Sequence, residues 1–224
     1  MTTTPETKSK KKRSPFYMDG EINLILHTRM TQSLLAGNWE YGQLGLWQFA
    51  LKIRDLWISH QADDPYADWF FMKIDEKIHR IREQAHELEN YYQQRLAQLR
   101  GFSIKVFENR RPMQLDLKFV IPFSYMGAAL LPELDYLSRQ AYTLRHMGQL
   151  LEPEKSPSKI AANIRQLFSI PMGWRKLVTR QDILDNTPAA QEAISKMGKI
   201  PSAILNKEIK FLFLLDNMSR TRAK

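Results

Sequence analysis

Apolar and polar residues alternate along residues 21–30, close to the start of the chain. Ile22, Leu24 and Leu26 fall on one face of this stretch, and mostly polar residues fall on the other. A period of two is typical of a half-buried β-strand. The sequence therefore predicts a strand over residues 21–30, which ends before Gly37.

The pattern then changes to a helical period. Apolar residues recur at three- and four-residue steps over residues 44–60 and again over residues 65–99. Asp64 followed by Pro65 is typical of a helix start, and Gly101 is typical of a helix end. We predict that the helix beginning at Pro65 is the longest of the protein. Its length of about 50 Å would suit a scaffold or a dimer contact.

Alternation returns after this helix. Residues 102–107 and 113–120 alternate, and turn-forming residues 108–112 separate them. This arrangement predicts a β-hairpin. Its second strand would turn apolar residues to one face and polar residues to the other: Leu115, Leu117 and Phe119 against Gln114, Asp116 and Lys118.

The remaining chain favours helices. A long helix is predicted over residues 124–151, where Pro132 either kinks the helix or marks its true start. Short helices are predicted to start at four further signals: Ser156–Pro157, Thr179–Asp182, Thr187–Pro188 and Pro201.

The order of these elements indicates the fold class. Strand, helix and helix occur over residues 21–99 and again over residues 113–169. We therefore predict an α+β protein that is mainly helical, with a small antiparallel β-ribbon packed on long helices.

Positive charge is concentrated at the two ends of the chain. The protein has 33 Lys and Arg against 24 Asp and Glu, a net charge of +9. We expect a disordered basic tail over residues 1–15, one globular domain over residues 16–215, and a basic C-terminal tail over residues 216–224. Basic tails attract polyanions by releasing counterions, but a tail that only improves solubility would have the same composition.

The composition gives little support for an enzyme. The chain has no cysteine and only nine glycines, and it lacks the glycine-rich loops that bind phosphates. We therefore predict a non-enzymatic protein without a cofactor or a resident metal. The longest apolar run, at residues 211–215, is far shorter than the roughly 20 residues that span a bilayer, so no membrane association is expected.

Three groups of side chains are candidates for chemistry. The spacing of His79, Glu83 and His86 could hold a metal, but the polar outer face of a long helix explains it more simply. A nearby acidic group could hold a divalent ion, but helix capping explains most of its members more simply. We predict that the local aromatic residues belong to the core instead of a ligand cage. The acidic group is Asp63, Asp64 and Asp68, and the aromatic residues are Trp47, Trp57, Trp69 and Phe70.

The alternating strands offer a surface for nucleic acid. A two-stranded ribbon fits the major groove of DNA, where Asn and Gln suit adenine and Lys and Arg suit guanine or phosphate. An ordinary half-exposed sheet would have the same alternation, so this alternative stays open. The predicted DNA-binding residues are Asn23, His27, Arg29, Lys105, Arg110, Arg111, Gln114 and Lys118, together with Lys10, Lys11, Lys12 and Arg13 of the tail.

Short segments of the chain are similar to known DNA-binding families. The strand Pro112–Phe119 resembles the reading strand of ribbon-helix-helix repressors such as Arc, although one long or kinked helix follows it here. Three further segments, 63–70, 142–148 and 178–187, resemble the AcaB-like family of regulators carried by conjugative plasmids and integrating conjugative elements. This second resemblance covers roughly residues 20–206.

The AcaB-like resemblance implies a function. It implies a cytoplasmic, nucleoid-associated activator of conjugative transfer genes that binds double-stranded DNA through a core similar to ribbon-helix-helix proteins. Such a regulator would act as a homodimer and would contact RNA polymerase or a co-activator. The strands could pair between two chains, which we favour, or between the two halves of one chain. The alternative is a non-enzymatic structural or interaction protein of the conjugation machinery that uses the long helix 65–99.

Overall fold

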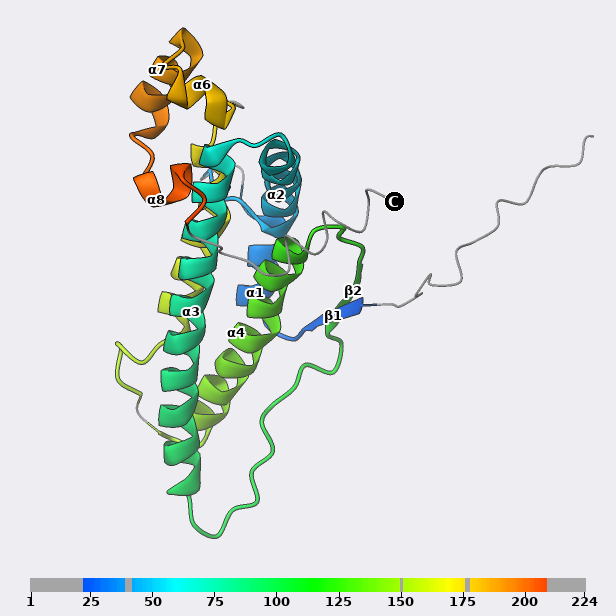
Figure 1. Ribbon diagram of the computed structural model, residues 1–224. Coiled ribbons are helices and arrows are strands. Elements are labelled where there is room, and N and C mark those ends of the chain that lie inside the picture. Colours follow the sequence, from blue (N-terminus) through cyan, green and yellow to red (C-terminus); the bar gives the residue numbers. More distant parts are fainter. Residues whose placement is uncertain (1–21, 39–41, 150, 176–177, 209–224) are drawn as a thin grey trace, which may run out of the picture.

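Helices dominate the protein and a two-stranded sheet lies at one side of them (Figure 1). The computed structural model describes residues 22–38, 42–149, 151–175 and 178–208. The elements are β1 (Ile22–Leu26), α1 (Arg29–Ala36), α2 (Leu46–Gln61), α3 (Pro65–Ala97), β2 (Met113–Leu117), α4 (Pro122–His146), α5 (Pro157–Ser169), the 3-10 helix η2 (Ile170–Gly173), α6 (Arg180–Leu184), α7 (Pro188–Met197) and α8 (Ser202–Leu205).

The long helix α3 organises this fold. The Asp64 side chain accepts hydrogen bonds from the backbone N–H groups of Tyr66 and Ala67 at 2.8 and 3.4 Å, and Pro65 occupies the first helical position. The predicted start and length of this helix are therefore confirmed. α3 packs along α4 and α5, and Figure 1 shows α4 standing between α3 and the sheet.

The main core lies between α2, α3, α4 and α5. Phe71 of α3 stacks on Phe123 of α4 with ring centroids 4.7 Å apart, and Phe49 of α2 lies 5.0 Å from Phe168 of α5. A Cβ atom on Gly127 would come within 2.6 Å of the Phe49 ring. Because cores are close-packed, this glycine lets α4 approach α2 closely. A second, smaller apolar cluster joins the C-terminal helices to the start of α3.

The first predicted strand is shorter than expected. β1 ends at Leu26, and α1 begins at Arg29, so the period-two pattern was wrong for residues 27–30. Buried side chains in α1 follow a helical spacing at Thr31, Leu34 and Leu35. A pattern of ten residues can satisfy both periods over part of its length, and tertiary packing decides where one ends.

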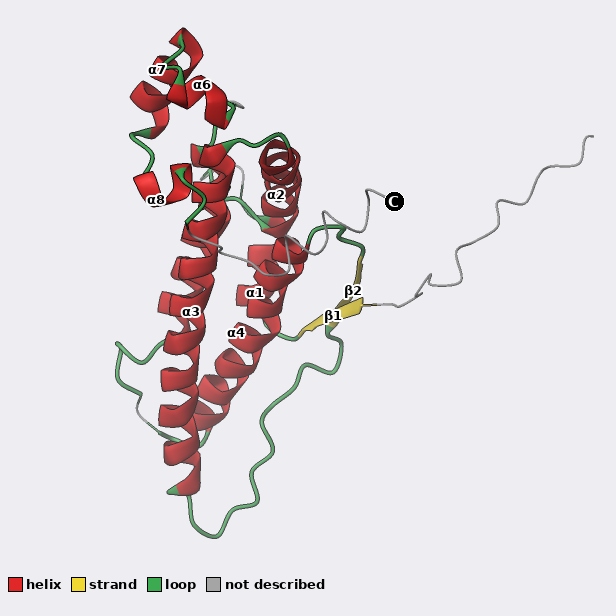
Figure 2. Cartoon of the chain, in the orientation of Figure 1, coloured by secondary structure: helices red, strands yellow, loops and turns green. Residues whose placement is uncertain are grey.

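The predicted hairpin is also wrong. Residues 102–107 form no strand; they belong to a long connection that runs back beside α4 before β2 begins (Figure 2). The antiparallel partner of β2 is β1, with Ile22 opposite Leu117 and Leu26 opposite Met113. Both strands of the ribbon therefore come from one chain, which corrects the preference for pairing between two chains.

The remaining helix predictions agree more closely with the structure. α4 starts at Pro122 and ends at His146, so the predicted range 124–151 was shifted, and Pro132 lies inside the helix. The predicted starts at Ser156, Thr179 and Thr187 are confirmed, since each of these side chains accepts a hydrogen bond from the first turn of its helix. No described helix is long and apolar enough to cross a membrane.

Candidate nucleic-acid interface

The ribbon turns a polar face outward. Asn23 lies opposite Asp116 in the register, and Ile25 lies opposite Gln114; all four side chains are exposed. The other face of the ribbon is apolar and packs on the helices, with Leu24 and Leu117 buried. The predicted alternation of β2 is therefore present in the structure.

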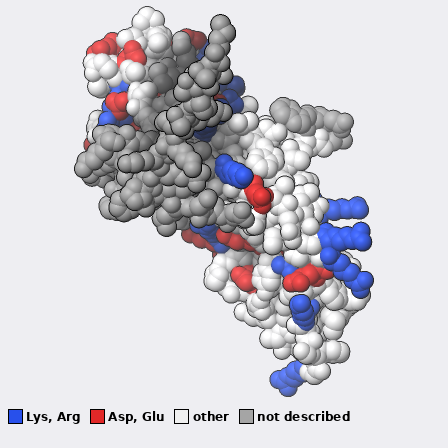
Figure 3. Space-filling model, turned by 90° about the vertical axis from the view of Figure 1, so that its right-hand side faces the viewer, with Lys and Arg blue, Asp and Glu red and all other residues white. Residues whose placement is uncertain are grey.

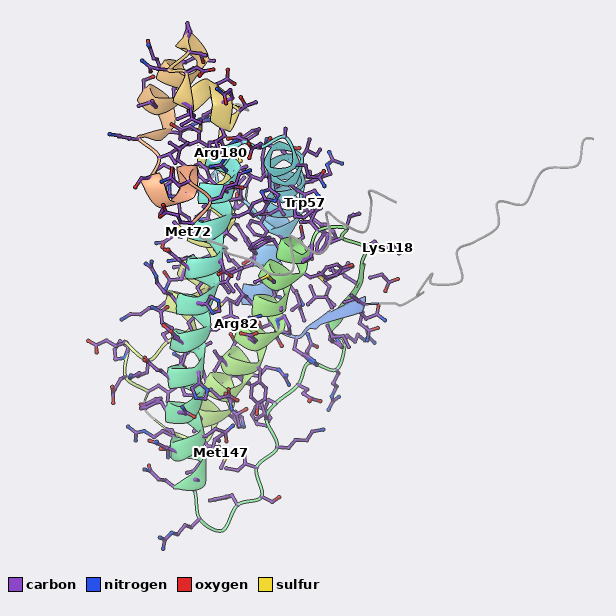
Figure 4. The ribbon with its side chains drawn as sticks, in the orientation of Figure 1. Trp57, Met72, Arg82, Lys118, Met147 and Arg180 are labelled. Carbon is purple, nitrogen blue, oxygen red and sulfur yellow. The ribbon has the colours of Figure 1, made fainter. Side chains whose placement is uncertain are left out.

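Lys118 continues this outer face one residue beyond β2. Its side chain is exposed, and Figure 4 shows the residue at the ribbon side of the molecule, away from α3. Figure 3 shows that face of the molecule, where Lys and Arg side chains gather along the right-hand edge with fewer Asp and Glu. The described part of the ribbon side is therefore basic as well as polar.

A buried carboxylate holds the ribbon in place. Asp135 of α4 accepts hydrogen bonds from the backbone N–H groups of His27 and Thr28 at 3.0 and 2.8 Å, and from the hydroxyl of Thr31 at 2.9 Å. Its second oxygen accepts from Arg139 Nε at 3.1 Å. A negative charge at the start of a helix is stabilising, so Asp135 fixes the β1–α1 junction against α4.

The connection before β2 is held at the same place. Asn109 donates its backbone N–H to His27 Nδ1 at 3.1 Å and its side-chain N–H to the His27 carbonyl at 3.3 Å. The Phe107 N–H donates to Thr143 Oγ1 of α4 at 3.0 Å. Arg139 also lies 3.4 Å from Glu108. These contacts order the segment that leads to Arg110 and Arg111.

The other predicted DNA-binding residues lie in elements different from those predicted for them. Arg29 is exposed in the first turn of α1 instead of on a strand. Lys105 lies in the connection and not on a partner strand, 3.7 Å from Glu108. Arg110 and Arg111 are exposed just before β2 instead of at a hairpin tip, and His27 is half-buried beside Asn109.

The structure thus brings one set of predicted residues together on the ribbon and its flanks. These are Asn23, Gln114, Lys118, Arg110 and Arg111. The tail residues Lys10, Lys11, Lys12 and Arg13 lie outside the described residues.

Sequence reasoning missed the residues that position this surface. Asp135 and Asn109 have no short-range motif for these contacts, because their partners at residues 27 and 28 lie 82 or more positions away in the chain. Arg139 follows Asp135 by one helical turn and pairs with it. One signal was available: Asp135 falls on the apolar face of its helix, between Leu134 and Leu137. A carboxylate on a buried face needs partners, so it marks a structural contact.

The acidic group near α3 has a structural explanation. Arg180 donates to Asp63 at 3.2 Å and to Asp68 at 2.7 Å, and His60 Nδ1 lies 2.6 Å from Asp68. Figure 4 shows Arg180 at the end of the molecule where α3 begins. This basic partner makes the group an internal ion-pair network.

Burial and hydrogen bonding shift two of these carboxyl groups in opposite directions. Burial raises the pKa of Asp64 and outweighs the hydrogen bonds from Trp174 and the helix N–H groups. Burial also acts to raise the pKa of Asp63, but hydrogen bonds and charge from Lys207 and Arg180 outweigh it, so that pKa is lowered.

The structure also explains the histidine group on α3 and the aromatic residues. His79 lies 3.6 Å from Asp75, an ordinary contact one turn away on α3, and no group of described residues could hold a metal ion. Trp57 and Phe70 are buried in the core. Trp47 lies at the surface of α2, where its ring packs edge-on against Phe119 at 5.7 Å.

A known protein family and a solved structure are similar to this chain. The family described as "Transcriptional regulator AcaB" matches residues 17–213. Among solved structures, the fold is similar to that of selenomethionine-containing AcaB from uropathogenic E. coli, with a TM-score of 0.51 and 14% sequence identity over 86% of this chain and 98% of the other. No curated protein matches the sequence.

Proposed function

Because this chain belongs to the AcaB family of transcriptional regulators, we propose that its β1–β2 ribbon binds double-stranded DNA and reads the sequence of the major groove. The main support is the outer face of the ribbon. It presents an amide on each strand, at Asn23 and Gln114. It also presents Lys118, an exposed cation that forms no ion pair with another described residue. Amide side chains can make two hydrogen bonds to adenine in the major groove.

The residues beside the ribbon supply the phosphate contacts in this proposal. Arg110 and Arg111 precede β2, and Arg29 stands at the start of α1; all three are exposed. Such contacts fix the position of a protein on the duplex, whereas the ribbon selects the sequence. His27 and Asn109 contact each other, so we assign His27 to positioning the segment that carries Arg110 and Arg111.

The proposed DNA-binding core is a ribbon-helix-helix unit built within one chain. One half is β1 followed by α1 and α2, and the other is β2 followed by α4 and α5. The strands pair antiparallel, and α1 packs on α4 and α5. In the usual unit two chains each supply one strand, whereas here one chain supplies both.

The proposal also includes a cellular role, which is supported by membership in a family of transcriptional regulators. The protein activates genes of conjugative transfer, at the nucleoid, through a globular domain over residues 16–215 with basic tails at 1–15 and 216–224. A second copy of the chain on the same operator and a contact with RNA polymerase or a co-activator complete the proposal. No cofactor or catalytic step is part of it.

The test begins by selecting a preferred duplex from a random DNA pool with the purified full-length protein. Gln114→Ala should weaken binding to the selected duplex about tenfold and leave binding to a scrambled duplex unchanged, because it removes one base contact. Lys118→Ala should weaken both and lower the salt dependence by about one phosphate contact.

A matched control is available on α3. Arg80 is an exposed cation that pairs with Glu76 at 3.1 Å, and α3 has no extensive contact with the ribbon. Arg80→Ala should leave affinity unchanged by fluorescence anisotropy at fixed salt. Wild-type affinity in both ribbon variants would rule out the ribbon as the reading surface. A reporter gene behind the selected duplex then tests activation.

A further inference from the structure

The apolar face of the ribbon loses its cover toward one end. Leu26, Leu24 and Ile22 share this face, and their exposed fractions rise from 0% and 5% to 50%. Ile22 is the first described residue of β1, opposite the last residue of β2. The inner face is therefore open at Ile22, on the β1 side of this end, although Leu117 opposite it is buried.

A groove of about 340 Å³ lies next to this open end. Trp47 and Leu51 of α2 form one side of it, and Phe119 and Val120, which follow β2, form the other. Trp47, Leu51 and Val120 are exposed although they are large and apolar. Exposed apolar patches of this kind mark interaction sites.

The charge of the groove is one-sided. Arg54 and Lys118 line it, both are exposed, and no carboxylate is among its lining residues. Neither cation forms an ion pair with another described residue. The groove therefore suits a segment that combines apolar side chains with acidic ones.

The backbone beyond β2 is oriented to accept another pair of residues. The Tyr125 hydroxyl accepts from the Phe119 N–H at 3.0 Å and donates to the Leu117 carbonyl at 3.2 Å. Backbone groups of successive residues in an extended strand face opposite sides, as the alternating ladder of an antiparallel pair requires. The N–H and carbonyl of Lys118 therefore face the side on which β1 lies.

The chain itself contains a segment that fits. Because Ile22 is opposite Leu117, the register assigns Glu21 to the position opposite Lys118. Residues 15–21 read Pro-Phe-Tyr-Met-Asp-Gly-Glu and lie outside the described part of the chain. If this segment continued β1 at a period of two, Glu21 and Asp19 would share the outer face with Lys118, and Met18 and Phe16 would share the inner face with Ile22.

We propose that residues 15–21 extend β1 along residues 118–121 and cover the groove with Met18 and Phe16. The pair of Glu21 and Lys118 adds opposite charges directly across the two strands. This docking does not depend on DNA. Its consequence for DNA rests on the proposed function: Lys10, Lys11, Lys12 and Arg13 would begin beside the end of the reading ribbon.

The absence of cysteine in the natural sequence permits a direct test. In the full-length double variant E21C/K118C, the two Cα atoms would be about 5.5 Å apart, within the range that a disulfide spans. Mild oxidation without DNA should cross-link them within one chain, as measured by peptide mass spectrometry. The rate should be about tenfold above that of E6C/K118C, whose first cysteine lies on the same tail but outside the segment.

Two further variants of E21C/K118C test the groove itself. Met18→Asp should slow the cross-link several-fold, because it places a charge against Trp47 and Leu51, whereas Tyr17→Asp on the other face should not. Equal rates in the two double-cysteine variants, or equal effects of Met18→Asp and Tyr17→Asp, would overturn the proposal. Cross-links formed only between two chains would also overturn it and would assign the groove to a second copy.

Discussion

Two buried charged residues anchor opposite parts of the molecule, and they do so with opposite chemistry. Asp135 is 1% exposed and accepts backbone N–H groups at the start of α1. Arg180 is 7% exposed and donates to the carbonyls of Ile204 and Leu205 at the end of α8, both at 2.6 Å. Each charge has the sign that compensates the dipole at its helix end.

The surroundings of the two residues differ in their access to water. Asp135 lies on the main core and pairs with Arg139, whose side chain is 17% exposed. Arg180 joins the smaller C-terminal cluster to α3, and one of its carboxylate partners, Asp63, is half exposed. Water can replace a lost partner at Arg180 more easily than at Asp135. The ribbon is therefore tied to the main core, whereas the C-terminal helices are attached at a junction that is more exposed to water.

The largest effect is expected from Asp135→Ala. It leaves the part-buried N–H groups of His27 and Thr28 without their acceptor and removes one of the two carboxylates beside Arg139, so the free energy of unfolding should fall by about 3 kcal/mol in urea titrations. Asp135→Asn keeps an acceptor oxygen and should cost about half as much. Where the variants remain folded, DNA affinity should fall with them. A fully stable Asp135→Ala variant would contradict the anchoring role.

Arg180→Met should have a smaller and more local effect. We expect a loss of about 2 kcal/mol that is confined to α6, α7 and α8, because Asp63 and the freed carbonyls gain water. Hydrogen exchange resolved by peptide should accelerate there and stay unchanged in α4 and the ribbon. DNA affinity should equal that of the wild type. Faster exchange throughout the protein would show that the two regions are not independent.

Asn109→Ala should act mainly on DNA binding. It removes the side-chain bonds to the His27 carbonyl and from the Arg111 N–H, at 3.3 and 3.0 Å. We expect the free energy of DNA binding to weaken by about 1 kcal/mol, because the segment that carries Arg110 and Arg111 is no longer held in place. Asn206→Ala is the matched control, since this asparagine pairs with Glu208 beside the C-terminal helices. Equal DNA affinities of the two variants would show that the segment before β2 does not contribute to DNA binding.

The smallest effect is a pH dependence of the C-terminal junction. The folded-state pKa of Asp63 is below its ordinary value, so the unfolded state binds more protons. Its stabilising contribution is present above the ordinary carboxylate pKa of about 4 and is lost as the pH falls through the lowered value. Asp64, whose pKa burial raises, acts in the opposite direction.

Hydrogen exchange of α6–α8 should therefore increase on acidification below about pH 4. Asp63→Asn should reduce this dependence. An identical pH profile in Asp63→Asn would assign it to other carboxyl groups.

Predictions from the sequence succeeded where the cause is local. Asp64 and Pro65 start α3, and Ser156 starts α5, because an N-cap side chain bonds with residues only two or three positions away. The outer face of β2 was predicted correctly for the same reason, since alternation is a property of neighbouring residues. The candidate residues Gln114 and Lys118 follow from that alternation alone.

Predictions failed where distant parts of the chain decide. Alternation in residues 102–107 and 113–120 and the turn-forming residues between them predicted a hairpin. In the structure β2 pairs with β1, more than 80 positions away. The buried face of a strand needs helices to cover it, and α4 packs against β1. Likewise, Asp135 accepts the N–H groups of residues 27 and 28 where β1 has ended and α1 is about to begin.

The amino-acid order alone thus determined where most helices begin, which side chains alternate on the strands, and that the chain is basic. Tertiary structure decided which strand β2 pairs with, where β1 ends, and which charged residues lie inside. The physical reason is range. Capping and periodicity involve groups within one turn or one strand, whereas pairing and burial of charge depend on surfaces that exist only after the helices pack.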